Sequence, residues 1–311
     1  MQADFRVTAL DDVLRHVEMA GIFYCASELS EPWGLEVPAM DSLWFHVITS
    51  GRCTVSVPDV EPVSLGPGDL LLVPHGQGHT AWGSEPARLA PVLDLPHEYE
   101  TDTYAVLKHG GGGAVTSIVC GSVRFDHPAA RHLIAALPPL IHIEAAHVGR
   151  ADWLRATLDL LAEETRSVRP GSDAVVSRLC DVLVLQAIRS WIDRDPAARS
   201  GWLGAIRDDG IGAAIAAVHR DPGECWTVGS LAALATMSRS AFAARFTDLV
   251  GEPPMQYVTR WRMYRADDLL RRGATVAAAG HAVGYESEAA FSRAYARVMG
   301  ISAGATRRAV A

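Results

Sequence analysis

Two segments in the last third of the chain repeat one pattern: TVGSLAALATMSRSAFAARFTDLVG at 227–251 and TVAAAGHAVGYESEAAFSRAYARVMG at 275–300. Each segment begins with Thr-Val, continues into a short apolar helix and a turn, and ends on a glycine after a second helix. The second helix of each carries two aromatic residues four positions apart, Phe242/Phe246 and Phe291/Tyr295. A repeated pair of short helices around a turn predicts two helix-turn-helix units.

The second helix of each pair is preceded by residues that commonly cap helix N-termini. Ser238 in the first unit, and Glu286 and Ser287 in the second, precede the helix at positions where a side-chain oxygen accepts from free backbone N–H groups. A helix of this length fits the major groove of DNA, where arginine makes bidentate contacts to guanine. The residue types on the solvent-facing side of each second helix therefore indicate DNA recognition.

Three runs within this region resemble the AraC/XylS transcription regulators: SRSAFAARF at 238–246, GEPPMQYVTRWRM at 251–263 and VGYESEAAFSRAY at 283–295. The resemblance covers about a hundred residues. It implies a DNA-binding domain of two helix-turn-helix units joined by a long central helix, here 254–271. The alternative without DNA binding is an all-α domain of repeated helical hairpins.

The resemblance also assigns roles to individual residues, and some positions depart from the family. Gly280 replaces the usual alanine, which costs up to about 1 kcal/mol of helix stability. Ala303 and Thr306 replace proline and tyrosine, which predicts a looser last turn. The expected DNA contacts are Ser238, Arg239, Ser240, Ala243, Ala244 and Arg245 in the first unit, Arg262 in the central helix, and Ser287, Glu288, Ser292, Arg293 and Arg297 in the second unit.

These side chains predict different tasks for the two units. Ser240, Ala243 and Ala244 are small, so the first unit is expected to read bases weakly and to depend on Arg239 and phosphates. Arg293 stands at the expected base-reading position of the second unit. Arg262 is predicted to contact phosphates, which position a protein on DNA without reading its sequence.

The charge of the 311-residue chain is unevenly distributed. Its net charge is −8, but from Cys225 onward 11 arginines stand against 6 carboxylates, a net +5, which leaves −13 for residues 1–224. A basic segment attached to an acidic one fits a DNA-reading module joined to a sensor module.

Five cysteines without a CxxC spacing, no leader and no long apolar run indicate a cytoplasmic protein without a disulfide framework and without a membrane span.

Residues 1–125 are predicted to form an antiparallel β-barrel. Short β-rich runs at 43–49, 53–57, 70–73, 89–95 and 115–119 recur between Gly, Pro and Asp residues. The segment 68–79, GDLLLVPHGQGH, resembles the second motif of the cupin barrel, and the whole region resembles the cupin-type domain that precedes the DNA-binding domain in one AraC subgroup. The fold expected is therefore α+β, a cupin-like barrel followed by helices and an all-α double helix-turn-helix domain.

Two kinds of site are considered in this barrel. Trp44, His46, His79 and Trp82 are expected to line a ligand pocket, with ordinary barrel core as the alternative. His46, His79 and Cys120 are a plausible ligand set for a divalent metal such as zinc, although the first cupin motif lacks the usual His-x-His pair and glutamate. Hydrogen-bonded core histidines are the alternative to a metal site.

The remaining residues divide into a connector, a linker and the DNA-binding domain. Helices are predicted at 8–20 and, in a connector spanning 126–194, at 130–137, 152–167 and 172–193. The apolar faces of the last two predict either packing on the barrel or pairing with a second chain in a homodimer. The polar, proline-containing segment 195–204 reads as a linker, and 205–311 as the DNA-binding domain, beginning with a helix at 209–219.

The sequence therefore predicts a transcription regulator with promoter DNA, a small-molecule effector, a second copy of the chain and, for an activator, RNA polymerase as partners. One alternative is a metal-dependent cupin enzyme with an accessory helical domain. Another is a DNA-binding protein whose barrel serves only as a dimerisation scaffold. No catalytic residues are predicted, because the Ser, His and Asp residues show no nucleophile elbow.

Overall fold

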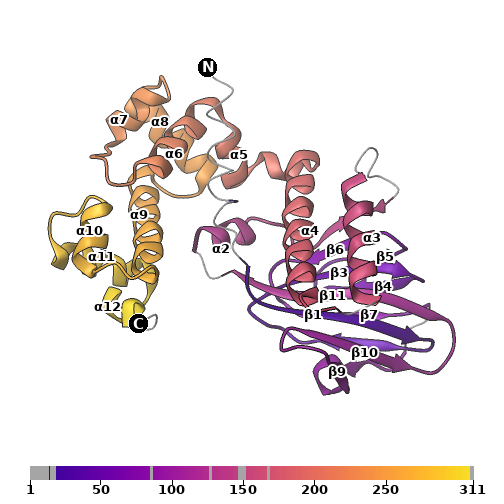
Figure 1. Cartoon of the computed structure of the whole chain (residues 1–311). Helices are drawn as coiled ribbons and strands as arrows, with labels where there is room; N and C mark the ends of the chain where they lie inside the picture. The colour runs from indigo at the N-terminus through magenta and orange to yellow at the C-terminus, as the bar shows by residue number, and fades with distance from the viewer. Residues whose placement is uncertain are drawn as a thin grey trace. The chain divides into compact units, whose positions relative to one another are not determined.

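The computed structural model describes residues 19–84, 87–125, 128–145, 152–166 and 169–308, together with Leu14. It divides into two compact units (Figure 1). The sheet unit comprises the described residues between 19 and 126 and between 137 and 193. The helical unit comprises those between 127 and 136 and between 194 and 311. Of the predicted helix at 8–20, the structure describes Leu14, which is helical, and Met19 and Ala20, which begin a β-strand instead.

Two β-sheets form the body of the sheet unit. The larger has seven strands in the order β12-β6-β3-β11-β1-β10-β9, and the smaller has five in the order β5-β4-β7-β2-β8. The strands are β1 (Met19–Ser30), β2 (Gly34–Val37), β3 (Leu43–Ser50), β4 (Cys53–Ser56), β5 (Val63–Leu65), β6 (Leu70–Val73), β7 (His79–Trp82), β8 (Ala90–Pro91), β9 (His97–Tyr99), β10 (Tyr104–Gly110), β11 (Val115–Phe125) and β12 (Ile141–Ile143).

The core between the sheets follows from alternation along the strands. On β3, Trp44 and Ile48 belong to a buried cluster with Trp33, Leu35 and Leu71, because alternate side chains of a strand point to one face. Most strand pairs are antiparallel, but β1 pairs with β10, and β2 with β8, in parallel. The α+β prediction is confirmed, as two packed sheets followed by helices.

Two predicted elements of this unit differ from the structure. The run at 89–95 forms only the short β8 and a 3₁₀ turn, η1 (Val92–Asp94). The long strands β1 and β10, which the short-run pattern missed, occupy adjacent places in the larger sheet. The sheet unit also includes β12, beyond the predicted boundary at residue 125, because it pairs with β6.

Two helices lie over one face of the larger sheet, α3 (Asp152–Arg166) and α4 (Ser172–Arg194) (Figure 1). Their buried residues include Leu154 and Leu161 on α3 and Cys180, Leu183 and Ile188 on α4. The bounds agree with the predicted helices at 152–167 and 172–193. No helix among the described residues is both long and apolar enough to cross a membrane.

The helical unit contains the repeated helical pairs. Its helices are α2 (Pro128–Ala135), η3 (Pro196–Arg199), α5 (Gly201–Arg207), α6 (Asp209–Arg220), α7 (Val228–Leu234), α8 (Arg239–Val250), α9 (Pro254–Arg271), α10 (Val276–Ala282), α11 (Glu288–Met299) and α12 (Ala303–Arg308). The long α9 lies between the α7–α8 pair and the α10–α11 pair (Figure 1).

The predicted boundaries of the connector and the linker are wrong at two places. Helix α2 groups with the helical unit, where it contacts α9. The segment 195–204 is helical rather than a linker: Asp195 caps η3 by accepting from the Ala197 N–H, and Ala198, Trp202 and Leu203 are buried. Its polar composition concealed an apolar stripe that packs on α6 and α8.

Candidate functional site

The first helix-turn-helix unit is set by local capping and a small aromatic core. The Thr227 side chain accepts from the Ser230 N–H at the start of α7, and the Ser238 side chain accepts from the Ala241 N–H at the start of α8. Gly251 ends α8 in the left-handed conformation, with φ of 84°. Phe242 and Phe246 are buried and therefore direct the opposite face of α8 to solvent.

The second unit repeats these devices. Thr275 caps α10, Ser287 caps α11 by accepting from the Ala290 N–H, and Gly300 ends α11 with φ of 73°. Ser287 is the capping residue, whereas Glu286 precedes it. Phe291 and Tyr295 are buried on α11. Both predicted helix-turn-helix pairs are therefore present, with the predicted Ser238 and Ser287 as caps and without a capping role for Glu286.

The glycine that departs from the family pattern is required by close packing. A Cβ atom at Gly280 would lie 2.9 Å from Cγ of Phe291, nearer than side-chain carbons approach one another. The loss of helix propensity at Gly280 is thus offset by the close approach of α10 to the ring on α11.

Helix α12 is held to α9 and α11 by hydrogen bonds and burial. Tyr295 donates a short hydrogen bond from its hydroxyl to Asp267 Oδ1 and lies 3.0 Å from Thr306 Oγ1. Asp267 is fully buried on α9, and its Oδ2 accepts from Arg271 Nε at 2.7 Å. Ala303 and Thr306 are also buried. The expectation of a looser last turn is wrong, because Thr306 joins this hydrogen-bonded network.

Most of the predicted DNA contacts lie on exposed surface. On α8 and its cap, Ser238, Arg239, Ser240, Ala244 and Arg245 are exposed and Ala243 is half-buried. On α11 and its cap, Ser287, Glu288, Arg293 and Arg297 are exposed and Ser292 is half-buried. Within the described part of the chain, Arg293 and Arg297 have no hydrogen bond or ion pair, which leaves both guanidinium groups available to a ligand.

Arg245 and Arg262 have partners within the protein. Arg245 Nε donates to Asp208 Oδ2 at 3.0 Å, and Asp208 is the N-cap of α6. Arg262 donates from Nε and Nη2 to the carbonyl oxygens of Pro222 and Glu224, both at 2.7 Å. These bonds hold the loop before α7 against α9, so Arg262 has a structural task that was not predicted, and its phosphate contact stays a prediction. The sequence could not show this, since the partners are backbone atoms about 40 residues away.

The core of the first helix-turn-helix unit contains polar groups that no sequence pattern predicted. The Tyr257 hydroxyl lies 2.7 Å from His219 Nε2 and accepts from Trp202 Nε1 at 3.3 Å. His219 also stacks on Trp261, with ring centres 3.4 Å apart. These contacts join α5, α6 and α9 beneath the first helix pair.

The predicted barrel site brings two histidines together between the sheets. Nε2 of His46 on β3 lies 2.7 Å from Nε2 of His79 on β7, so one imidazole donates and the other accepts. Burial lowers the pKa of His46 to about 4, and burial together with the neighbouring His46 lowers the pKa of His79 to about 2. Both rings are therefore neutral at neutral pH. Trp44 lies edge-on to His79 at 6.0 Å.

Cys120 and Trp82 do not complete the predicted sites. Cys120 opposes His46 across the strands, but its thiol lies 3.8 Å from Ser27 Oγ and donates to the Cys25 carbonyl. The described residues contain no group of three or more His, Cys, Asp or Glu side chains that could hold a metal ion. Zinc binding by His46, His79 and Cys120 therefore stays a prediction, in which the two histidines are in contact and the thiol is engaged elsewhere. Trp82 lies three positions after His79 on β7, and so points to the opposite face of that strand.

Comparisons with known proteins agree with this architecture. The family described as Cupin matches residues 8–193, and the family described as Helix-turn-helix domain matches residues 231–309. A protein of Streptomyces lividans named as an AraC-like transcription regulator is 32% identical over 303 residues, which cover 96% of this chain and 97% of that protein. The chain belongs to the AraC-like transcription regulators.

Other AraC-like regulators match over most of the chain as well. RclR of Escherichia coli, an RCS-specific HTH-type transcriptional activator, is 31% identical over 86% of this chain and 84% of its own length. AlkR of Acinetobacter baylyi, an HTH-type transcriptional regulator, is 29% identical over 93% of this chain and 95% of its own. Among solved structures, the DNA-binding domain of AdpA in complex with a target DNA is 31% identical, covers 32% of this chain and 89% of that chain, and has a TM-score of 0.31.

Proposed function

We propose that this AraC-like regulator binds promoter DNA in a sequence-specific way, in the cytoplasm, through both helix-turn-helix units. The observation that carries the proposal is the pair Arg293 and Arg297 on α11, which are exposed and have no polar partner within the described residues. Arginines free in this way can make bidentate contacts to guanine in the major groove. Two reading helices in one chain would enter successive major grooves, about 34 Å apart along the DNA.

The first unit would serve mainly to position the protein. Its α8 presents the small residues Ser240, Ala243 and Ala244, and Arg245 is paired with Asp208. Arg239 is the exposed arginine of this helix that has no hydrogen bond or ion pair in the described part of the chain. Sequence discrimination would then come mostly from α11, with α8 supplying phosphate contacts and groove shape.

The N-terminal sheet unit would bind a small-molecule effector and carry the dimer contact. Exposed apolar residues on its two helices, Leu160 on α3 and Val175 and Val182 on α4, support the second role. Sedimentation of the full chain tests it: Val182→Glu should shift a dimer toward monomer, and Leu93→Glu, an exposed apolar residue on η1, is the control. A wild-type chain that sediments as a monomer would contradict the dimer.

The alternative function, a metal-dependent cupin enzyme, has less support. His46 and His79 bond to each other, and Cys120 bonds to Ser27 and Cys25, so the described residues contain no assembled three-ligand set. The relatives over most of the chain are named as transcription regulators. RNA polymerase would be a partner only if the regulator activates.

Titration of the full chain onto the DNA upstream of its own gene tests the regulator function. We expect tight binding that survives random competitor DNA. The logarithm of the binding constant should fall linearly with the logarithm of the salt concentration, because phosphate contacts release counterions. Equal binding to both DNAs at every salt concentration would contradict sequence-specific recognition. The competitor separates base reading from charge attraction, since both DNAs carry the same phosphates.

A further inference from the structure

The two helix-turn-helix units touch each other directly, beside the central helix that they share. The first-unit loop, residues 221–226, precedes α7, and the second-unit turn, residues 282–287, lies where α10 gives way to α11. A Cβ atom at Gly284 would lie 2.5 Å from the carbonyl oxygen of Gly223, and one at Gly223 would lie 2.9 Å from that of Ala282. Glycine at both positions therefore permits the two backbones to approach this closely.

Arg262, in the middle of α9, contacts both of these segments. Its Nε donates to the Pro222 carbonyl and its Nη2 to the Glu224 carbonyl, each at 2.7 Å. Its guanidinium carbon also lies 5.9 Å from the centre of the Tyr285 ring, within the range of a cation–π contact. A Cβ atom at Gly284 would lie 3.2 Å from the same Nη2. One side chain therefore bridges the first-unit loop and the second-unit turn.

The contacts of Arg262 lead onward to both of the helices proposed to meet DNA. The first-unit loop is followed by Thr227, which caps α7, and α7 packs on α8. In the second unit, Tyr285 lies edge-on to Phe291, with ring centres 5.8 Å apart, and Phe291 is fully buried on α11. A rotation of one unit against the other would therefore stretch the hydrogen bonds of Arg262 or separate it from the Tyr285 ring.

We propose that Arg262 is a positioning residue that fixes the distance and angle between α8 and α11. It thereby fixes the spacing that the regulator requires between its two half-sites on DNA. The proposal rests on the proposed function, which is binding of DNA through both units. One base pair inserted between the half-sites moves the second by about 3.4 Å and turns it by about 35°. A rigid pair of units would then lose contacts at one half-site, whereas a loosened pair would follow the shift.

This positioning role differs from a phosphate contact in what its loss would do. Loss of a phosphate contact weakens binding equally at every spacing, because each DNA carries the same backbone. Loss of the bridge instead reduces the penalty for a wrong spacing. The ratio of affinities for correctly and wrongly spaced sites therefore separates the two roles.

Competition titrations of the full chain measure this ratio on three versions of its upstream binding site, with native spacing, one base pair inserted, or one removed. The wild type should lose affinity roughly 10- to 100-fold at either altered spacing, the cost of one lost base contact. Arg262→Ala should shrink this penalty roughly three- to tenfold, because the bonds that resist the shift are gone. Arg265→Ala is the matched control. It removes the same charge from α9, but its partner Asp268 lies on that same helix, so it should keep the wild-type penalty.

Gly223→Ala opens the same contact without changing Arg262. Its Cβ would meet the Ala282 carbonyl at 2.9 Å and force the first-unit loop away from the second-unit turn. It should shrink the spacing penalty in the same direction as Arg262→Ala, and thermal unfolding shows that each variant is folded. Spacing penalties equal to that of the wild type in the folded variants would overturn the proposal, as would equal losses at all three spacings.

Hydrogen–deuterium exchange of the DNA-free full chain tests the bridge independently of DNA. Arg262→Ala should speed exchange in the first-unit loop and also at the Gly284 and Tyr285 amides, which donate to carbonyls of α10 at 3.0 Å. Arg265→Ala should change neither segment. Faster exchange confined to the first-unit loop would mean that Arg262 holds that loop alone, and would overturn the bridge.

The two measurements together separate this proposal from the regulator function on which it rests. Specific DNA binding with an unchanged spacing penalty would remove the positioning role alone. A lack of specific binding would remove the regulator function, and with it the spacing requirement, while the exchange data would still decide whether Arg262 bridges the two units.

Discussion

The two helix-turn-helix units share one backbone plan but use their arginines differently. In the first unit, Arg245 is paired with Asp208, the cap of a neighbouring helix. In the second, Arg293 and Arg297 have no polar partner in the described part of the chain. The same helical repeat therefore uses its arginine for attachment to the rest of the domain in one copy and leaves two exposed arginines without a polar partner among the described residues in the other. Repetition of a fold does not imply repetition of a role.

Their buried polar centres also differ. The first unit is held by Tyr257, whose partners His219 and Trp202 come from helices that precede the repeat. The second is held by Tyr295, whose partner Asp267 carries a charge and is fully buried. A buried carboxylate depends strongly on each of its partners, so the second unit should be the more sensitive of the two to single changes.

The largest effect is expected for Asp267→Ala. This change removes the acceptor of both the Tyr295 hydroxyl and Arg271 Nε, and should lower the free energy of unfolding by roughly 3 kcal/mol. Asp268→Ala is the control, because Asp268 is also buried but pairs with Arg265 and Arg272, which are 43% and 66% exposed, and such pairs contribute only about 0–1 kcal/mol. Asp267 differs in that it also accepts from the buried Tyr295 hydroxyl. Urea unfolding measures both. Equal losses would mean that burial of Asp267 does not distinguish the second unit.

The next effect concerns DNA. Arg293→Ala should weaken binding at the cognate site by about 1–3 kcal/mol and relax one base preference, because it would remove the proposed base contact. Arg245→Ala should change cognate binding much less, since that side chain is paired with Asp208. Competition titrations against single-base variants of the site measure both. An equal loss from the two substitutions would remove the contrast between the units.

Smaller effects on stability, opposite in sign to each other, are expected when two glycines are replaced by alanine. Gly280→Ala gains about 1 kcal/mol in helix propensity but forces a Cβ to 2.9 Å from the Phe291 ring, for a net loss of about 1 kcal/mol. Gly229→Ala brings its Cβ against the flexible Arg239 side chain instead, and should stabilise by up to about 1 kcal/mol. Thermal unfolding decides the signs. A stabilised Gly280→Ala would show that α10 can move away from the ring.

What could be predicted from the sequence depended on whether the cause was local. The caps Ser238 and Ser287 and the terminating glycines Gly251 and Gly300 act within a few residues, so pattern alone located both helix pairs. The partners of Arg262 are backbone carbonyls distant in the sequence, and no residue pattern marks them. Local reasoning therefore assigned a solvent-facing role to an arginine that fixes a loop.

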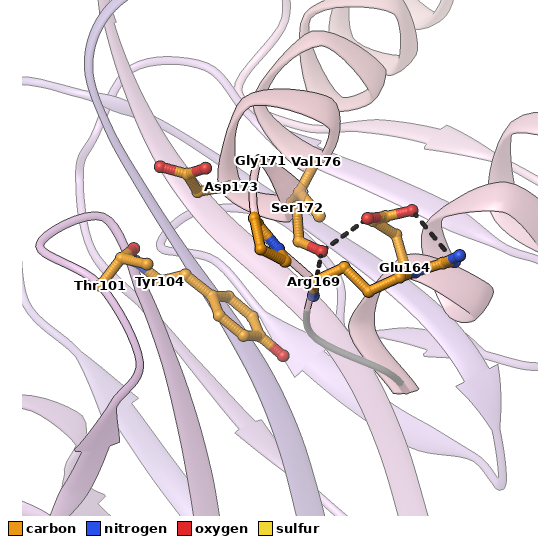
Figure 2. Close-up of a pocket in the computed structure, with 9 residues that line it drawn as sticks. Thr101, Tyr104, Glu164, Arg169, Gly171, Ser172, Asp173 and Val176 are labelled. Atoms are coloured by element: carbon orange, nitrogen blue, oxygen red, sulfur yellow. Dashed lines mark hydrogen bonds and ion pairs between the residues drawn. The ribbon is translucent and has the colours of Figure 1, made fainter.

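The same limit applies to the candidate sites of the sheet unit. The motif at 68–79 correctly directed His79 inward, and His46 meets it because two strands of different sheets face each other. A hollow of about 290 Å³ beside Tyr104 was not predicted, because its walls come from β10, α3 and α4 (Figure 2). The segment 195–204 was predicted to be a linker because its composition is polar, but Ala198 and Trp202 are buried.

The smallest expected effect concerns the stability contributed by the Asp208 carboxylate, the partner of Arg245. Asp208 is partly buried, which by itself raises its pKa, but the Ile211 N–H and Arg245 lower it, and the net pKa lies below the ordinary value. A carboxylate with a depressed folded-state pKa stabilises the fold above its unfolded pKa, and that contribution disappears as pH falls through the folded value. Asp208→Asn keeps a capping oxygen and removes only the charge. The wild type should therefore exceed it by at most about 1 kcal/mol at pH 7, and the difference should vanish in acid below the ordinary aspartate pKa.

Chemical unfolding of both proteins across that pH range measures the difference, and Arg245→Ala shows its source. In the Arg245→Ala background, Asp208→Asn should have a smaller effect at pH 7, because only the helix N–H groups then favour the charge. If the wild type and Asp208→Asn differ equally at pH 7 and in acid, the carboxylate charge is not what holds Arg245. The arginine of the first unit would then be as available to DNA as Arg293, and the asymmetry between the two units would rest on Ser240, Ala243 and Ala244 alone.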